Sequence, residues 1–189
     1  LRHAQGGQAF VSGAAILRDA TSQDIPALAA LGRESFVAKF GHLYQAEDLG
    51  AFLEGTFSES AIAAEMADPE RLYRLAESEE GELAGYCKIA LATSFPDHAR
   101  GRHAMELKQL YTAAGRTGQG IGAALMDWAM AEFRRRGADE VHLSVWSGNE
   151  GAQRFYERYG FGKLADTYFW VGKHRDDEFL FARMLDSDR

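Results

Sequence analysis

The residues best suited to chemistry form a glycine-rich turn in the second half of the chain. Three glycines, Gly118, Gly120 and Gly122, alternate with other residues there. They follow an apolar stretch that ends at Thr112 and overlap a helical pattern that begins at Ile121. Glycines let the backbone approach a ligand closely and direct N–H groups at it. A helix N-terminus adds a partial positive charge, so the segment predicts a site for a phosphate or pyrophosphate.

Two other phosphate-binding patterns do not fit this turn. A dinucleotide-binding fingerprint needs G-x-G-x-x-G early in a βαβ unit, with an acidic residue about 20 positions further on. Here the spacing is G-x-G-x-G, and the turn lies past the middle of the chain. A Walker P-loop ends in G-K-S/T, whereas this turn ends in Gly122-Ala123-Ala124. Taken alone, the turn leaves open a helix entry that binds nothing.

The turn resembles the pyrophosphate loop of the GNAT family of acyl-CoA-dependent N-acetyltransferases, whose pattern is Q/R-x-x-G-x-G/A. The matching residues are Thr117-Gly118-Gln119-Gly120-Ile121-Gly122. Every defined position fits except the first, where Thr117 stands in place of glutamine or arginine and Arg116 precedes it. This difference affects one side-chain contact to the pyrophosphate and leaves the backbone cradle unchanged.

A second motif follows after one further helical and one strand pattern. The family carries N-x-x-A-x-x-F-Y-x-x-x-G-F here, and residues 149–161 match every defined position. The two motifs stand in the family's order, and the resemblance covers roughly residues 16–185. It implies an α/β (α+β) fold, the GNAT acyl-CoA N-acyltransferase fold, with a central mixed β-sheet flanked by helices. It also implies a single acetyltransferase domain over residues 13–189.

Hydrophobic periodicity predicts the elements that would position these motifs. Strand patterns occur at residues 14–18, 72–76, 83–92, 104–112, 140–146, 161–164, 168–171 and 178–185. Helical patterns occur at residues 21–40, 47–57, 58–66, 121–136 and 149–159. This order gives a mixed sheet with helices on its faces.

Composition narrows the class of protein. The 189 residues fit one domain, and 46% hydrophobic with 26% charged residues is ordinary for a soluble globular protein. The net charge of −7 argues against a nucleic-acid partner, because such binding rests on excess positive charge. Cys87 is the single cysteine, so neither an intrachain disulfide nor a multi-cysteine zinc site is possible.

The same observations predict the cellular compartment of the protein. A lone cysteine suits a reducing compartment, and no apolar run approaches the roughly 20 residues of a membrane span. Residues 1–12 lack the basic start and long apolar core of a signal peptide, and we expect them to be flexible. We therefore expect a cytoplasmic protein with no membrane partner.

The resemblance implies transfer of an acetyl group from acetyl-CoA, as co-substrate, to an amine, by direct attack in a ternary complex and without a metal. It implies that Tyr156 is the acid near the thioester sulfur, although Tyr156 could also pack like Phe155. It implies that Glu106 is the base, directly or through water. The alternative for Glu106 is a solvated carboxylate at a sheet edge. His142 could also handle protons, but we expect it to face solvent.

The resemblance also assigns residues to coenzyme A. The backbone of Leu110, Tyr111 and Thr112 should hold the pantetheine arm, beside a strand at residues 141–146 that splays away. Asn149 should meet the coenzyme, or serve as a helix N-cap, or both. The turn should bind the pyrophosphate through Thr117, Gly118, Gln119, Gly120, Ile121, Gly122 and Ala123. Residues 100–103 are basic and could touch the 3′-phosphate, although a solvated loop is the simpler interpretation.

The acceptor is the least determined part. Short stretches at residues 40–44, 144–150, 168–172 and 176–180 resemble the bacterial PaiA-type spermidine/spermine acetyltransferases, which suggests a polyamine. Acidic residues of the early helices would then select it, namely Glu34, Glu47, Asp48 and Glu54. Other readings remain: a protein N-terminus, an amino acid or an antibiotic as acceptor, or a non-catalytic acyl-CoA sensor. A homodimer is the default expectation for this family.

Overall fold

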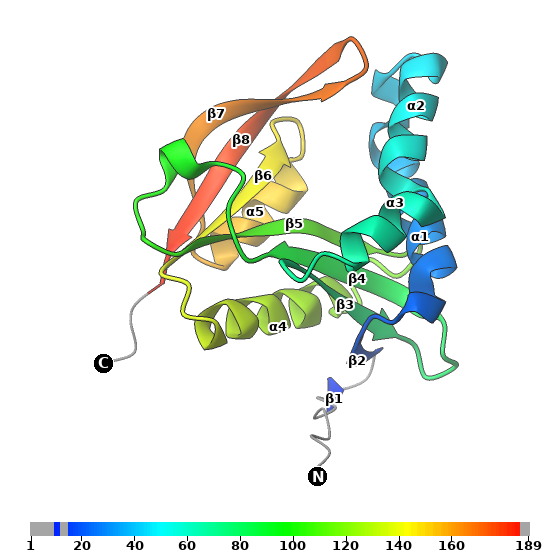
Figure 1. The fold of residues 1–189 in the computed structure, drawn as a ribbon, viewed down its shortest axis with the longest axis horizontal. Coiled ribbons are helices and arrows are strands. Elements are labelled where there is room, and N and C mark those ends of the chain that lie inside the picture. The colour runs from blue at the N-terminus through cyan, green and yellow to red at the C-terminus, as the bar shows by residue number, and fades with distance from the viewer. Residues whose placement is uncertain (1–9, 12–14, 186–189) are drawn as a thin grey trace.

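The computed structural model describes residues 10–11 and 15–185 and shows one sheet with helices on both faces (Figure 1). The strands are β1 (Phe10–Val11), β2 (Ala15–Asp19), β3 (Arg71–Glu77), β4 (Leu83–Ala90), β5 (Ala104–Thr112), β6 (Glu140–Trp146), β7 (Gly162–Val171) and β8 (His174–Met184). The helices are α1 (Ile25–Phe40), α2 (Ala46–Phe57), α3 (Glu59–Met66), α4 (Ile121–Arg135) and α5 (Glu150–Arg158). The predicted mixed sheet flanked by helices is confirmed.

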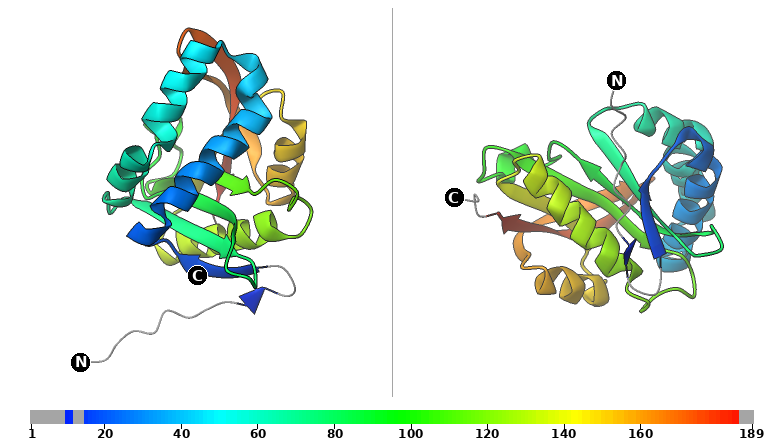
Figure 2. Two further views of the ribbon diagram at one scale, coloured as in Figure 1. Left: turned by 90° about the vertical axis from the view of Figure 1, so that its right-hand side faces the viewer. Right: turned by 90° about the horizontal axis from the view of Figure 1, so that it is seen from below.

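The sheet order is β1-β2-β3-β4-β5-β6-β8-β7, and every neighbouring pair is antiparallel except β5 with β6. Helix α4 packs on β3, β4 and β5, while α1 and α3 cover the other face. Figure 2 shows these helices on opposite sides of the sheet. The largest apolar cluster lies under α4 and α5, and two smaller clusters lie under α1, α2 and α3.

The parallel pair β5–β6 is short, and this shapes the molecule. The two strands are in register only from Ala104–Glu140 to Glu106–His142. Beyond that point β5 stays paired with β4 as far as Thr112, and β6 stays paired with β8 as far as Trp146. The strands therefore diverge, which confirms the predicted splaying. A V-shaped opening forms, and it leaves one backbone edge of residues 107–112 without a strand partner.

Two expectations differ from the structure. The separate strands at 161–164 and 168–171 are one strand, β7, because a bulge between Lys163 and Ala165 shifts the alternation of side chains while the pairing with β8 continues. Residues 10–11 pair with β2, inside the segment expected to be flexible. The rest of residues 1–12 lies outside the part of the chain that the structure describes.

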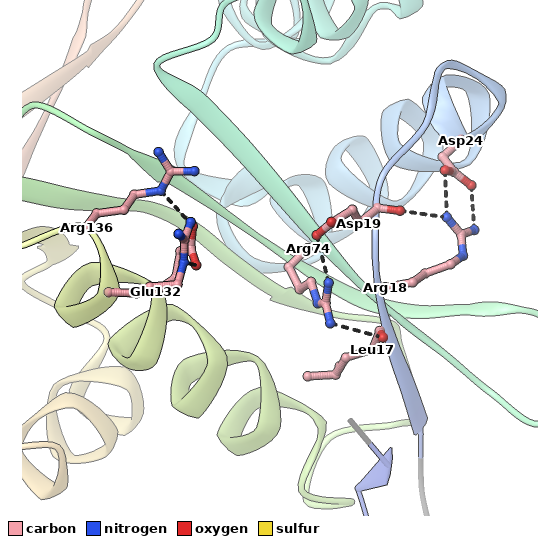
Figure 3. Close-up of polar contacts among 8 residues, drawn as sticks. Leu17, Arg18, Asp19, Asp24, Arg74, Glu132 and Arg136 are labelled. Carbon is pink, nitrogen blue, oxygen red and sulfur yellow. Dashed lines mark hydrogen bonds and ion pairs between the residues drawn. The ribbon is translucent and has the colours of Figure 1, made fainter. Parts of the chain in front are cut away.

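An ion-pair network anchors the first helix to the sheet edge (Figure 3). The guanidinium of Arg18 on β2 donates to both carboxylate oxygens of Asp24, at 2.8 and 2.7 Å, just before α1 begins. Arg18 also pairs with Glu77 of β3. The neighbouring strand adds a second pair, Arg74 with Asp19, at 2.7 Å. The network fixes the direction of α1, whose far end reaches the site described below.

The Arg18–Asp24 pair predicts a loss of stability in acid. Hydrogen bonds from Arg18 lower the pKa of Asp24 from 3.8 to about 2. A carboxyl group with a depressed folded pKa stabilises above its unfolded pKa and loses that contribution as the pH falls toward the folded pKa. We expect Asp24→Asn to lower the free energy of unfolding by about 2 kcal/mol at pH 7. The difference from wild type should shrink between pH 4 and pH 2.

Urea denaturation across this pH range measures the effect, with the exposed Asp97→Asn as the control. A deficit in Asp24→Asn that is the same at pH 7 and pH 2 would contradict the ion-pair explanation.

Candidate active site

The V-shaped opening widens into a cavity of about 430 Å³. Its walls come from β5, β6 and β8, from the ends of α1 and α2, and from one face of α5. Its polar and charged lining residues include Lys39, Tyr44, Lys88, Glu106, Lys108, Gln109, Tyr111, Ser144, Asn149, Tyr156, Asp176 and Glu178. Aromatic rings supply much of the remaining surface, namely Phe36, Phe40, Phe52, Phe57, Phe95, Trp146, Tyr168 and Phe169.

The glycine turn lies at the end of β5, where α4 begins. Gly118 and Gly120 have φ angles of +84° and +82°, a conformation that side chains rarely adopt. The first intrahelical bond runs from the Ala124 N–H to the Gly120 carbonyl at 2.9 Å. The N–H groups of residues 121–123 therefore have no partner within the helix. Together with the helix dipole they form an anion cradle that fits a pyrophosphate.

Thr117 stands at the first position of the loop, where the family has glutamine or arginine, and this difference has a structural consequence. Thr117 is exposed, and its short side chain leaves the cradle to the backbone. The adjacent Arg116 does not replace the missing contact, because its guanidinium pairs with Glu82 of the β3–β4 turn at 3.1 Å. Gln119 is also exposed, and its side-chain amide lies 3.4 Å from the Gly115 carbonyl.

Helix α5 turns one face toward the cavity. Asn149 accepts a hydrogen bond from the Ala152 N–H at 3.2 Å, so it is an N-cap, and it also lines the cavity with Ala152 and Tyr156. These three residues are spaced three and four apart, which places them on one side of a helix. Gln153 fixes the start of α5 by donating to the carbonyl of Ser147 at 2.9 Å.

Tyr156 is held as a hydrogen-bond donor. Burial raises the pKa of its phenol well above the ordinary value, so the hydroxyl stays protonated at neutral pH. Its ring packs against Phe155 and Phe161. The ring packs as one of the two sequence alternatives expected, and the side chain also lines the cavity. Its role as the acid stays a prediction.

Glu106 is buried in a central strand and is only 2% exposed, so the solvated-edge alternative for it is wrong. One carboxylate oxygen accepts from the Lys108 ammonium at 2.8 Å, and the other accepts from the Ser94 N–H at 2.6 Å. Lys108 lies two residues further along β5, at a bulge that leaves it out of the β4–β5 register.

Two further carboxylates, which sequence reasoning did not assign to the site, face the cavity from β8. Asp176 accepts a hydrogen bond from the Tyr44 hydroxyl, and Glu178 accepts one from the Ser144 hydroxyl. Burial raises the pKa of Glu178, and the neighbouring carboxylates of Asp176 and Glu106 add to the rise. The signal in the sequence was their spacing, since acidic residues two apart share one face of a strand.

The lysines of the cavity differ in their partners. Lys88 pairs with Glu65 of α3 at 2.7 Å, and Lys108 pairs with Glu106. Lys39, near the end of α1, lies at the mouth of the cavity, and no ion pair involves it within the described part of the chain. Partial burial lowers the pKa of Lys39.

Two sequence expectations are wrong, one for His142 and one for the acidic residues of the early helices. His142 is fully buried instead of facing solvent, because both faces of β6 are covered, and its Nδ1 lies 2.8 Å from the Thr93 hydroxyl. Glu34, Glu47 and Glu54 are exposed and do not line the cavity. They lie on the outward faces of α1 and α2, whose inner faces are aromatic.

Asp48 likewise does not line the cavity and has a structural role. Its carboxylate accepts from the Lys173 N–H at 3.3 Å, which ties α2 to the β7–β8 hairpin. The loop at residues 100–103 is held by the carboxylates of Asp139 and Glu140 at the start of β5. The glycine turn lies beyond the opposite end of that strand, so the loop and the turn do not form one site.

Comparisons with known proteins agree with this geometry. A sequence model of the acetyltransferase (GNAT) family matches residues 35–161, and the chain belongs to this family. An aminoalkylphosphonate N-acetyltransferase of Salmonella typhimurium is 34% identical over 148 residues, covering 77% of this chain and 83% of that protein. An uncharacterised N-acetyltransferase of Lactobacillus delbrueckii is 28% identical over 165 residues, covering 87% of this chain and 94% of that protein.

A solved structure shares the fold. The PaiA N-acetyltransferase of Thermoplasma acidophilum, in complex with coenzyme A, superposes with a TM-score of 0.72 at 20% identity and covers 89% of this chain and 98% of that one. Within the described residues, no helix is long and apolar enough to cross a membrane. The same residues contain no group of three or more metal-ligating side chains.

The glycine turn predicts a loss of coenzyme binding on substitution. In Gly120→Ala, a Cβ would both strain the backbone at φ +82° and stand beside the cradle. We expect the Kd for coenzyme A to rise at least tenfold, equivalent to about 1.4 kcal/mol. Titration calorimetry measures it. Gly137→Ala at the other end of α4 is the matched control, because Gly137 has a similar φ of +76°. Equal weakening in both variants would contradict the assignment.

Proposed function

We propose that this GNAT N-acetyltransferase moves an acetyl group from acetyl-CoA to a small primary amine by direct attack in a ternary complex, with a polyamine such as spermidine as the first acceptor. The observation that carries the proposal is the arrangement of the cavity. Tyr156 lines it from α5, and three carboxylates, those of Glu106, Asp176 and Glu178, line it from β5 and β8.

The residues present fit coenzyme A, which supplies the acetyl thioester when bound. The cradle at Gly118–Gly120 and the first turn of α4 would hold its pyrophosphate. The unpaired backbone edge of Leu110, Tyr111 and Thr112 would hydrogen-bond the pantetheine arm as an added strand does. Asn149 lies beside this path at the start of α5.

The reaction sets two proton problems. A free alkyl amine has a pKa near 10.4, so a cavity carboxylate must take a proton before the nitrogen can attack. The thiolate then leaves, and its pKa of about 8.5 makes it a fair leaving group. Tyr156, which lines the cavity, would donate a hydrogen bond to the sulfur. Because the pKa of Tyr156 lies above that of the thiol, this donor stabilises charge more than it drives proton transfer.

The acceptor assignment rests on charge and surface. Carboxylates inside the cavity attract ammonium groups, and the aromatic walls favour both alkyl chains and cations. An amine with an anionic tail is the second candidate, and Lys39 favours it, because an unpaired ammonium at the mouth would attract the tail. The Salmonella relative's name describes such a substrate. A non-catalytic acyl-CoA sensor would need none of these carboxylates.

Removing the phenol of Tyr156 tests the reaction. We expect Tyr156→Phe to lower kcat at least tenfold, about 1.4 kcal/mol of barrier, with little change in KM for acetyl-CoA. Thiol release with and without spermidine measures it. Arg154→Ala is the control, because Arg154 is an exposed residue of the same helix. Thiol release equal to wild type in Tyr156→Phe would refute the role. No release from wild type with any amine would favour the sensor.

Lys39 separates the two acceptor classes. If the acceptor is a polyamine, Lys39→Ala should raise kcat/KM for spermidine severalfold, because a like charge at the mouth is removed. The same variant should not improve turnover of 2-aminoethylphosphonate. A wild type that prefers the phosphonate, and loses that preference in Lys39→Ala, would overturn the polyamine assignment in favour of an amine with an anionic tail.

A further inference from the structure

The three cavity carboxylates are not equivalent, and their hydrogen bonds separate them. Glu106 has both oxygens occupied, one by the Lys108 ammonium at 2.8 Å and one by the Ser94 N–H at 2.6 Å. Protonating Glu106 would remove the negative charge that binds the Lys108 ammonium and would weaken both hydrogen bonds. At a site that is 2% exposed, water does not replace that charge pairing.

Asp176 is also engaged. The hydroxyl of Tyr44 donates to one of its oxygens, and the imidazole of His174 lies 3.2 Å from the other. It is 6% exposed. These two contacts suit an anion that orients neighbouring groups.

Glu178 differs in both respects. Within the described residues, its single hydrogen-bond donor is the neutral hydroxyl of Ser144, which binds one oxygen and leaves the other for a ligand. In the register of the sheet it stands opposite Trp146, where β6 ends and the opening is widest. Burial raises the pKa of Tyr111, which lines the same cavity, and the nearby Glu178 carboxylate adds to the rise.

We propose, resting on the acetyl transfer argued above, that Glu178 is the catalytic base and that Glu106 is a positioning residue. One oxygen of the Glu178 carboxylate takes a proton from the acceptor ammonium. The freed lone pair forms the C–N bond to the thioester carbon, and the C–S bond breaks with its electron pair going to sulfur. The acylated nitrogen loses a second proton, which neutralises the thiolate while Tyr156 donates a hydrogen bond to the sulfur. Glu178 returns its proton to solvent through the cavity mouth.

The groups facing Glu178 set its proton affinity. They are Asp176 on its own strand, Glu106 and Lys108 on β5, and Ser144 on β6. Burial and the two carboxylates raise the pKa of Glu178, while Ser144 and Lys108 oppose the rise. A carboxyl group with a raised pKa is a stronger base than an ordinary glutamate. Glu106 and Lys108, as a fixed pair, hold the wall opposite Glu178.

The pH profile of kcat/KM for spermidine tests this assignment. Wild type should reach a plateau between the pKa of Glu178 and that of the amine. Without the base, only amine that is already neutral reacts, so Glu178→Gln should fall at least thirtyfold at pH 7 and then rise about tenfold per pH unit toward the amine pKa near 10.4. Glu106→Gln should lower the plateau without this slope. The control is Asp177→Asn, an exposed residue of the same strand.

Ser144→Ala provides a second test of the Glu178 assignment if Glu178→Gln folds poorly. It removes the donor that orients Glu178, so kcat should fall severalfold while the shape of the wild-type profile is kept. A plateau retained in Glu178→Gln, or the steep slope appearing in Glu106→Gln instead, would overturn the assignment. If wild type transfers no acetyl group to any amine but binds coenzyme A, the proposed function fails instead, independently of Glu178.

Discussion

The short parallel contact between β5 and β6 is the constraint on which the site depends. Each of these strands has a full-length antiparallel partner on its other side, β4 for β5 and β8 for β6. Only three residue pairs join the two halves of the sheet. The bulge at Lys108 increases the local twist of β5, so the halves separate toward the carboxyl ends of both strands. The cavity is the space this separation leaves.

The same divergence brings the functional parts together. It frees one backbone edge of β5, which leads directly into the glycine turn and the first turn of α4. It also lets the start of α5 reach the opening, because α5 begins immediately after β6 ends. The anion cradle, the free strand edge and Tyr156 therefore lie along one path. Helices α1 and α2 close the other side with aromatic rings, held in place by the Arg18–Asp24 anchor and by Asp48.

Most charged side chains of the cavity are paired with an opposite charge. The side chains without such a partner indicate where a ligand would bind. Lys88 is matched by Glu65 and Lys108 by Glu106. Asp176 accepts a hydrogen bond from the Tyr44 hydroxyl and lies 3.2 Å from the His174 imidazole. Glu178 inside the cavity and Lys39 at its mouth are the charged groups without an ion-pair partner among the described residues. Burial raises the pKa of Glu178 and lowers that of Lys39, which favours the neutral form of each. Such groups gain most from a ligand that supplies the missing partner, which is why they carry the proposals about base and acceptor.

The local spacing of residues was enough to predict the glycines at 118, 120 and 122 and the helix start at Asn149, and most helices and strands lie close to the predicted ranges. The prediction of two strands in place of β7 was wrong, because a bulge shifts the alternation of side chains. Which side chains face each other across the cavity depends instead on how distant segments of the chain pack together. Nothing in the local sequence distinguishes Glu34 and Glu47 from Glu178. They nevertheless lie outside the cavity, because the inward faces of α1 and α2 are aromatic. His142 and Glu106 are buried because strands that seemed half-exposed lie in the middle of the sheet, and burial is set by neighbours far away in the chain.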